Sequence, residues 1–384
     1  MQVILNLVKK MNKKIEWLEN NEGMGLYVHI PFCTSICTYC DFSKMYYKKE
    51  WVDRYLKALK KEIQQYDINV PITTLYIGGG TPSSLNEEQL ERLLLILKPY
   101  AGSALEYTIE VNPESMTYEK LLLFKTYGIN RLSIGVQTFN EAILKKIGRL
   151  HHNQEVFWLI SQAWEVGIKN ISIDLMYNLP LQTKEDILKD LMIVETLPIT
   201  HLSYYSLILE EHTVLYNEHF EGMDEQEEYT ITEIIREKLE QFGFHRYEIS
   251  NFEKDGHPSL HNCVYWLNQH YYGFGLGAHG YLDNIRYNNT KQLSAYLNEE
   301  FLQTKETIGH KESIFEALML GLRLANGISL PLFKQRYQID LLTYYQEKLQ
   351  PFINQGLLII EENHLCPTSK GMDLLDFILL ELVD

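Results

Sequence analysis

The stretch Tyr27-Val-His-Ile-Pro-Phe-Cys-Thr-Ser-Ile-Cys-Thr-Tyr-Cys-Asp-Phe42 places three cysteines, Cys33, Cys37 and Cys40, in one short loop. The CxxxCxxC spacing brings three thiolates to one place. An iron-sulfur cube that only carries electrons is normally held by four cysteines. Three cysteines leave one iron open to bind a small molecule, so the stretch predicts chemistry at a cluster.

Two other kinds of site could use these cysteines. A structural zinc site would need a further nitrogen or sulfur ligand, and His29 is the nearest candidate. A disulfide with one spare thiol would suit a secreted chain, but 384 residues with five cysteines and no secretory signal are typical of a reduced cytoplasm. We therefore favour the cluster and a cytoplasmic location, with Cys263 and Cys366 as packing residues.

Length and charge limit the classes of function. A chain of 384 residues, 45% of them hydrophobic, can form one large domain and a smaller one. The net charge of -16 argues against nucleic acid and anionic membrane surfaces as partners. No apolar run is long enough for a transmembrane segment. Residues 1–23 make a poor signal peptide and are expected to be a loose extension, with Met24 a plausible alternative start.

Short apolar strands alternate with amphipathic helices through the next two hundred residues. Strands are expected at 26–30, 74–77, 107–111, 131–134, 171–175 and 201–207. Helices are expected at 51–66, 87–97, 118–127, 154–166 and 184–197. Repeated strand-helix units give parallel strands with right-handed crossovers. The fold class is therefore α/β, and a partial TIM-type (β/α)6 barrel is predicted.

Polar residues gather where these strands end, which is where such barrels carry function. The candidates are Gly79, Gly80, Thr81, Glu110, Gln137, Arg149 and Asp174. Glycine lets the backbone approach a ligand closely, and the fork of Arg149 is a natural partner for a carboxylate. Taken singly, each residue also fits an ordinary loop or salt bridge, and the glycines also fit a tight turn without a ligand.

The cysteine spacing, with the aromatic Tyr39 before the last cysteine, resembles the radical S-adenosylmethionine (SAM) superfamily. The resemblance implies a 4Fe-4S cluster held by the three cysteines, SAM chelating the open iron, and an electron donor that reduces the cluster. By carry-over onto matching positions, the SAM contacts would be Tyr27, Gly79, Gly80, Thr81, Glu110, Gln137, Arg149 and Asp174.

Further motifs narrow the resemblance to one branch. They are Tyr27 to Cys33, Gly78-Gly-Gly-Thr-Pro-Ser83, Arg131-Leu-Ser-Ile-Gly-Val-Gln-Thr-Phe139, Ile173-Asp-Leu-Met-Tyr-Asn-Leu-Pro180 and Tyr247-Glu-Ile-Ser-Asn-Phe252. They look like the branch that holds oxygen-independent coproporphyrinogen III dehydrogenase and the HemW-type heme chaperones. One departure is Asn178, where the family usually has glycine. Asn tolerates a left-handed backbone, so the turn is expected to be kept.

Three features favour the chaperones over the dehydrogenase. Phe42 stands where the dehydrogenase has a further cysteine, and only 26 residues precede Tyr27, whereas the dehydrogenase has a longer leading segment. The segment from His261 to Trp266 matches the HNxxYW motif of the chaperone side. The resemblance thus implies heme as cargo and heme-accepting apo-proteins as partners. The alternative is radical oxidative decarboxylation of coproporphyrinogen III.

The HNxxYW motif has a second interpretation. Imidazole can ligate heme iron, and aromatic rings suit a porphyrin edge, so the candidate heme residues are His261, Asn262, Tyr265 and Trp266. Equally, His261 and Trp266 could pack between the barrel and the C-terminal domain.

The last hundred residues change in pattern. Helices are expected at 313–324, 331–337 and 341–350, followed by a hairpin that turns at 361–363. Pro331 suits the first position of its helix. This order predicts a winged-helix-like α+β domain over 281–384, after a barrel over 24–280.

Overall fold

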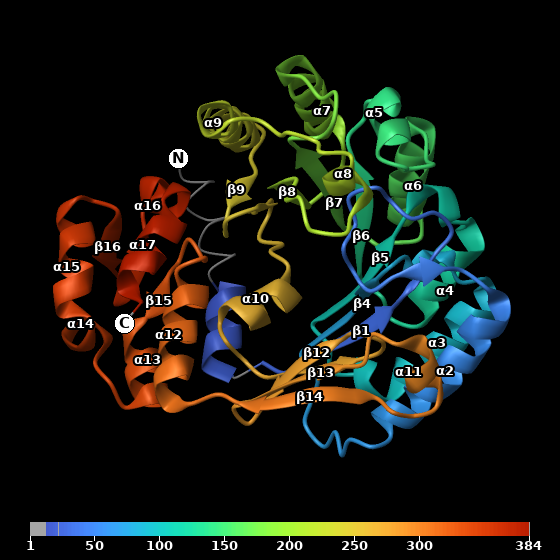
Figure 1. The fold of residues 1–384 in the computed structure, drawn as a ribbon, viewed down its shortest axis with the longest axis horizontal. Coiled ribbons are helices and arrows are strands. Elements are labelled where there is room, and N and C mark those ends of the chain that lie inside the picture. The colour runs from blue at the N-terminus through green and yellow to red at the C-terminus, as the bar shows by residue number, and fades with distance from the viewer. Residues whose placement is uncertain (1–12, 22, 384) are drawn as a thin grey trace.

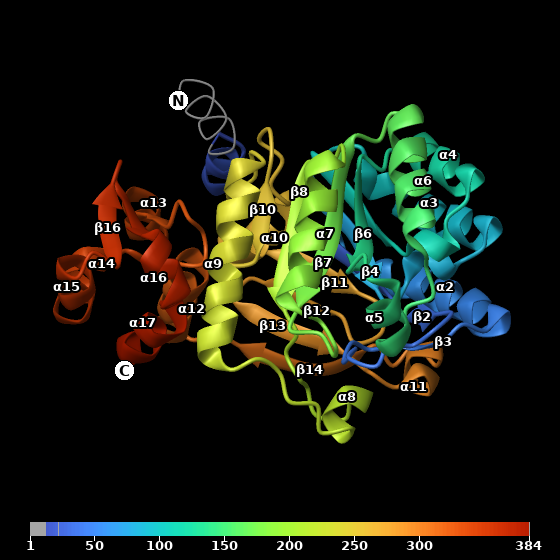
Figure 2. The same ribbon diagram turned by 90° about the horizontal axis from the view of Figure 1, so that it is seen from above.

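Six parallel strands form the centre of the computed structural model, which describes residues 13–21 and 23–383 (Figure 1). In sheet order they are β1 (Gly25–Ile30), β4 (Thr74–Gly79), β5 (Glu106–Val111), β6 (Arg131–Gln137), β7 (Asn170–Tyr177) and β8 (His201–Ser206). The helices between them are α2 (Lys49–Ile63), α3 (Glu87–Ala101), α4 (Tyr118–Thr126), α5 (Glu141–Lys146), α6 (Asn153–Glu165) and α7 (Lys184–Thr196). The predicted partial (β/α)6 barrel is confirmed, and its helices cover the outside of the curled sheet (Figure 2).

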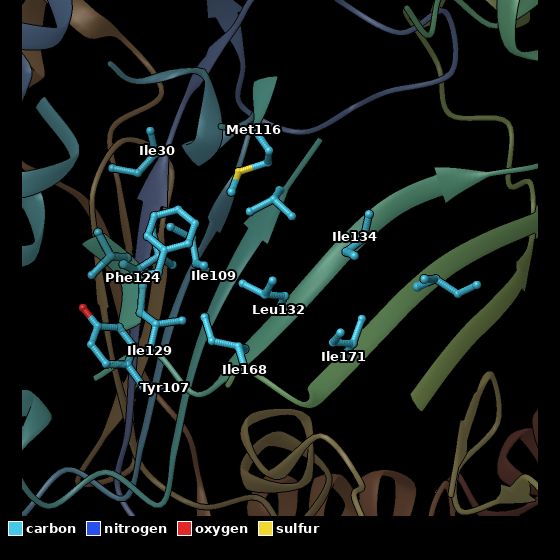
Figure 3. Packing of buried hydrophobic residues seen from close by; sticks show 14 of the residues in the cluster. Ile30, Tyr107, Ile109, Met116, Phe124, Ile129, Leu132, Ile134, Ile168 and Ile171 are labelled. Carbon is cyan, nitrogen blue, oxygen red and sulfur yellow. The ribbon is translucent and has the colours of Figure 1, made fainter. Parts of the chain in front are cut away.

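The strands alternate between apolar and polar side chains, and successive side chains of a strand point to opposite faces. The apolar set faces the helices, and Figure 3 shows Ile109, Leu132 and Ile134 of this layer with Phe124 from α4. The opposite set faces the inside of the curled sheet. It comprises Tyr27, Thr74, Tyr76, Glu106, Thr108, Glu110, Arg131, Ser133, Ser172, Asp174, His201 and Ser203. The interior of this barrel is therefore polar.

The sheet does not stop at the six strands. On one side it continues through β11 (Tyr271–Phe274), β12 (His279–Leu282), β13 (Ile285–Asn289) and β14 (Leu302–Thr307). On the other side β10 (Asn251–Glu253) and β9 (His245–Arg246) extend it. The expected domain boundary after residue 280 lies inside β12. The sequence did not reveal β11 to β14, because antiparallel strands joined by tight turns have no crossover helices between them.

Helix α10 (Leu260–Trp266) lies in the opening between the two ends of the sheet (Figure 1). The buried carboxylate of Glu106 accepts hydrogen bonds from the amides of Leu260 (2.9 Å) and His261 (3.0 Å). Buried Arg131 lies 4.0 Å from the same carboxylate. Anionic groups are stabilised at helix N-termini and beside guanidinium groups, so Glu106 fixes α10 as a floor under the polar interior.

The remaining barrel elements are short apart from one helix. They are β2 (Phe32–Cys33), β3 (Met45–Tyr46), α8 (Val214–Asn217), α9 (Glu225–Gln241) and α11 (Leu293–Leu297). Residues 13–21 also form a helix, whose Ile15 and Leu18 are buried against Tyr247 and Leu260. This part of the expected loose extension is packed on the fold, while its residues 1–12 and 22 lie outside the described residues.

The C-terminal part has its own hydrophobic core. Its helices are α12 (His310–Gly321), α13 (Leu330–Tyr337), α14 (Leu341–Tyr344), α15 (Gln346–Asn354), α16 (Ser369–Asp373) and α17 (Leu375–Leu382). Its sheet has the order β15 (Ile328–Ser329), β17 (His364–Pro367), β16 (Leu358–Glu361). Helices followed by a small antiparallel sheet confirm the winged-helix-like expectation. Helix α17 could not be predicted from the sequence pattern, because apolar residues on all its sides hide the helical period.

Replacing Glu106 with Ala tests whether this carboxylate holds α10 in place. The change removes two hydrogen bonds to α10 and leaves Arg131 buried without its carboxylate, so we expect a loss of about 3–5 kcal/mol in the free energy of unfolding. Urea denaturation followed by circular dichroism measures it. Glu237→Ala, at an exposed position of α9, is the control and should cost less than about 0.5 kcal/mol. Equal losses in the two variants would contradict this role of Glu106.

Candidate cluster and cofactor site

The cysteine loop lies across the carboxyl ends of the strands and is tied down at several points. The amide of Thr38 donates to the carbonyl of Ile147 (3.0 Å), and the Ser35 hydroxyl donates to the carbonyl of Gly148 (3.2 Å). The carbonyl of Thr38 accepts from the amide of Leu215 (3.1 Å), at α8. The turn after α5 and the start of α8 therefore fix the loop that carries Cys37.

The sulfur atoms are partly shielded from solvent. Burial raises the pKa of Cys33 to about 11, although the Thr81 hydroxyl donates to its sulfur at 3.5 Å, and burial also raises the pKa of Cys40. A bound metal would replace these thiol protons. Within residues 13–21 and 23–383, no group of three or more His, Cys, Asp or Glu is arranged to hold a metal ion. Ligation by the three cysteines therefore stays a prediction.

Two glycines lie directly against the cysteine loop. A Cβ added to Gly80 would lie 2.8 Å from the Cys33 sulfur, and one added to Gly148 would lie 3.6 Å from the Cys37 Cα. Both glycines therefore let the backbone approach the cysteines closely. His29 does not offer a free fourth ligand for zinc, because its Nδ1 is 3.0 Å from the Tyr27 hydroxyl and its Nε2 is 2.7 Å from the Ser43 carbonyl. Its burial lowers the pKa of His29 to about 4.

Glu110 lies at the upper end of the polar interior, beside the glycine turn. The Tyr76 hydroxyl donates to its Oε1 (2.8 Å), and the Gly79 amide donates to its Oε2 (2.9 Å). Burial raises the pKa of Glu110 to about 7. Gly79 has a φ of +117°, which favours glycine, and a Cβ there would lie 2.7 Å from the His29 ring. The predicted residues Tyr27, Gly79 and Glu110 are thus joined by contacts through Tyr76 and His29.

Gln137 and Arg149 meet at the end of β6. Gln137 has a φ of +67° at a bulge in the pairing of β6 with β7. A Cβ on Gly135 would lie 3.0 Å from the nearest side-chain nitrogen of each residue, and Arg149 donates to the Gly135 carbonyl. Gln137 Oε1 and Arg149 Nε are buried with no hydrogen-bond partner among the described residues. Buried polar atoms are normally paired, so these two fit a site that a polar ligand completes.

Asp174 lies next to Gly135 across the sheet, and the Ser133 hydroxyl donates to its Oδ2 at 3.3 Å. Burial raises the pKa of this carboxyl, although Arg131 and Arg149 oppose the shift. The following turn is kept as expected, because Asn178 adopts a φ of +64°. Its side-chain oxygen also accepts from the Met223 amide at 2.7 Å.

The HNxxYW motif is mostly internal. His261 is 1% exposed, its Nδ1 is 2.8 Å from the Thr74 hydroxyl, and its Nε2 is 2.7 Å from the Tyr265 hydroxyl. Burial lowers the pKa of His261 to about 3, and its ring stacks 5.1 Å from that of Tyr76. An iron ligand needs a free ring nitrogen, so these contacts favour the packing interpretation of His261.

The end of the motif faces the C-terminal domain. The guanidinium of Arg323 lies 4.7 Å from the Trp266 ring centre, and Arg336 donates to the Leu267 carbonyl at 3.2 Å. Asn262 is partly buried on the same helix. The motif therefore connects the barrel to the C-terminal domain, as its second interpretation expected.

Sequence reasoning missed Tyr76, which links Glu110 to His261. The strand pattern could have identified Tyr76, because its neighbours Leu75 and Ile77 face the helices and side chains alternate along a strand.

Replacing Glu110 with Gln tests the burial of its carboxyl. Because the folded pKa is about 7 and the ordinary value 4.5, the folded chain retains a proton that the unfolded chain releases. The wild type should therefore lose on the order of 3 kcal/mol of stability, relative to the variant, as the pH rises from about 4.5 to 7. Urea denaturation at a series of pH values measures this. Glu119→Gln, at an exposed position, should follow the wild type, and parallel profiles for Glu110→Gln and wild type would contradict the assignment.

No helix among residues 13–21 and 23–383 has the length and apolar character needed to cross a bilayer.

Comparison with known proteins agrees with this geometry. The family model described as "Radical SAM superfamily" matches residues 27–192, and the one described as "HemN C-terminal domain" matches residues 308–374. Among solved structures, coproporphyrinogen III oxidase (HemN) from Escherichia coli, a radical SAM enzyme, superimposes with a TM-score of 0.82 at 25% identity. The match covers 94% of this chain and 90% of that one.

Curated relatives match over most of their length. The heme chaperone HemW of Bacillus subtilis is 39% identical over 361 residues, which cover 90% of this chain and 95% of the relative. The heme chaperone HemW of Escherichia coli is 33% identical over 314 residues, which cover 78% of this chain and 82% of the relative. The chain therefore belongs to the heme chaperone HemW family of radical SAM proteins.

Proposed function

We propose that this protein is a heme chaperone, which binds heme and passes it to heme-accepting apo-proteins. The observation that carries the proposal is the 39% identity to the heme chaperone HemW of Bacillus subtilis over 90% of this chain. Two features support it further. Phe42 occupies the position of the dehydrogenase's additional cysteine, and the HNxxYW motif at His261 to Trp266 is complete.

A 4Fe-4S cluster and SAM are the resident cofactors of the proposal. Cys33, Cys37 and Cys40 would hold three irons of the cluster. The residues that would bind SAM are Tyr27, Gly79, Gly80, Thr81, Glu110, Gln137, Arg149 and Asp174. The unpartnered polar atoms of Gln137 and Arg149 support this set. When bound, the cluster can supply an electron to the sulfonium of SAM.

Each residue type has a defined task toward SAM. The carboxyls of Glu110 and Asp174 can accept from an amine or a ribose hydroxyl, and Arg149 can donate to a carboxylate. Tyr76 and the Gly79 amide hold the Glu110 carboxyl in place, and Ser133 holds Asp174. In a chaperone these cofactors would gate heme transfer or protein assembly instead of driving a reaction on the heme.

The partners follow from the same proposal. An electron donor would reduce the cluster, and the location would be the cytoplasm. The net charge of -16 supports protein partners over nucleic acid.

The other candidate is oxygen-independent coproporphyrinogen III dehydrogenase, in which a radical removes hydrogen from a propionate and carbon dioxide leaves. The similarity in fold to HemN from Escherichia coli, with a TM-score of 0.82, is the observation in its favour. It shares the cluster and SAM with the chaperone, so only the fate of the porphyrin separates the two.

Cysteine variants test the cluster. After anaerobic reconstitution, the wild type should hold about four irons per chain, and Cys37→Ala should lose most of the iron, the sulfide and the paramagnetic signal of the reduced cluster. Cys366→Ala, at a cysteine in the C-terminal domain, should keep all three. Iron and sulfide analysis with electron paramagnetic resonance gives the result. A Cys37→Ala protein that keeps a full cluster would overturn the assignment.

A heme titration and a turnover assay together test the function. Followed at the Soret band without oxygen, the reconstituted protein should bind one heme per chain saturably, and with SAM and a reductant it should leave coproporphyrinogen III unchanged. Absence of saturable binding would overturn the chaperone proposal. Conversion of coproporphyrinogen III to protoporphyrinogen would establish the dehydrogenase.

A further inference from the structure

A basic segment follows the cysteine loop in the sequence. Residues 44–61, which run through β3 and most of α2, contain seven Lys or Arg and two Asp or Glu. The segment therefore carries a formal charge of +5, whereas the whole chain carries -16. It contains neither the predicted cluster ligands nor the candidate SAM residues, so its charge needs another explanation.

Most of these cations form no ion pair. The exposed ones that lack a paired carboxylate among residues 13–21 and 23–383 are Lys48, Lys49, Arg54, Lys57 and Lys60. Of the two acidic residues in the segment, Asp53 is already paired with Arg92 at 2.7 Å. The opposite side of α2 packs on the barrel core, so these charges project from its exposed side. Unpaired surface charges of one sign attract an oppositely charged partner over a long range.

The basic segment begins directly beside the cysteine loop. Strand β3 pairs with β2, so Tyr46 lies one strand spacing, about 5 Å, from Cys33. The Tyr47 amide donates to the Cys33 carbonyl at 2.8 Å, and Lys44 donates through its Nζ to the Cys40 carbonyl. Figure 2 shows β2, β3 and α2 beside one another at one end of the molecule. The positive charges and the predicted cluster therefore lie on the same part of the surface.

Two exposed aromatic residues accompany these lysines. Phe42 is 65% exposed and Tyr46 is 59% exposed. Cys33 is buried, whereas Cys37 and Cys40 are partly exposed, so the cluster would come nearest to solvent at the Phe42 end of the loop. Exposed aromatic residues with a rim of charged ones are typical of protein–protein interfaces.

The other side of the cysteine loop has the opposite charge. Residues 210–228 contain eight Asp or Glu and no Lys or Arg. Helix α8 in this segment is bonded to the loop, because the Leu215 amide donates to the Thr38 carbonyl at 3.1 Å. An acidic partner is therefore attracted to the α2 side and repelled from the α8 side, which sets its orientation. A broad anionic surface, such as a membrane, would meet both sides at once.

We propose that the surface formed by Phe42, Tyr46 and the cations of residues 44–61 binds an acidic protein that carries one electron to the cluster. The inference rests on the proposed function, whose partners include an electron donor, and it names where that donor docks and the charge it has. The carrier loses one electron, the cluster gains one, and no atom is transferred. Docking beside Cys40 keeps the path of the electron short, and the positive charges raise the rate of encounter.

Electron transfer to the cluster-loaded full chain tests the surface. The probe is a reduced flavodoxin, an acidic protein that carries single electrons, and freeze-quench electron paramagnetic resonance follows reduction of the cluster. The triple variant Lys49→Gln, Arg54→Gln, Lys57→Gln should lower the rate about tenfold at low salt. Calorimetric titration should show a similar rise in the dissociation constant for the flavodoxin. The wild-type rate should fall as salt rises, and the rate of the variant should change little.

Two controls separate docking from other effects. Photoreduced 5-deazariboflavin, a small uncharged reductant that needs no docking surface, should reduce the wild type and the triple variant at equal rates. A second triple variant, Lys305→Gln, Lys311→Gln, Lys370→Gln, removes three exposed cations elsewhere and should react with the flavodoxin as the wild type does. Melting temperatures check that each variant is folded.

The outcomes distinguish this inference from the proposals on which it rests. A wild type that holds no cluster after reconstitution would overturn the cluster proposal and this inference with it. Reduction of the wild type by the deazaflavin but not by the flavodoxin would overturn only the docking surface, as would a variant of α2 that reacts with the flavodoxin at the wild-type rate. Binding of phosphatidylglycerol vesicles that is lost in that variant would assign the surface to a membrane. The heme titration decides the chaperone proposal separately.

Discussion

The polar interior of the strand layer is the constraint on which this structure depends. Six parallel strands turn their apolar side chains toward the helices and their polar ones inward. The inward groups include Glu106 and Arg131, which are each 2% exposed. Buried charges are stable only when paired and hydrogen-bonded. Helix α10 provides two amides that donate hydrogen bonds to Glu106, so the helix that stabilises this buried charge also closes the lower side of the barrel interior.

The floor and the candidate cofactor site are joined by stacked rings. Tyr76 stacks on His261 below and donates to Glu110 above, and Tyr27 stacks on Tyr76 at 6.0 Å. His261 thus packs against the tyrosine that holds the Glu110 carboxyl.

Local patterns were enough to predict the barrel, and long-range contacts were not visible in them. The strand ending at Val111 and the helix from Lys184 were predicted within a residue or two, because period and capping are local. The place of α10 depends on Glu106, which lies 154 positions from Leu260 in the sequence. The motif alone left His261 open to both interpretations, because its contact with Thr74, 187 positions away, is not visible in the sequence.

We propose that the polar interior ends in a cluster with one iron open to SAM, beside Arg149 and Gln137. The most direct measurement is electron-nuclear double resonance on the reduced cluster with SAM whose carboxylate carries a magnetic oxygen isotope. We expect a resolved coupling between that oxygen and the cluster, because three cysteines leave one iron without a protein ligand. A reduced cluster with SAM bound to the protein but no such coupling would contradict it.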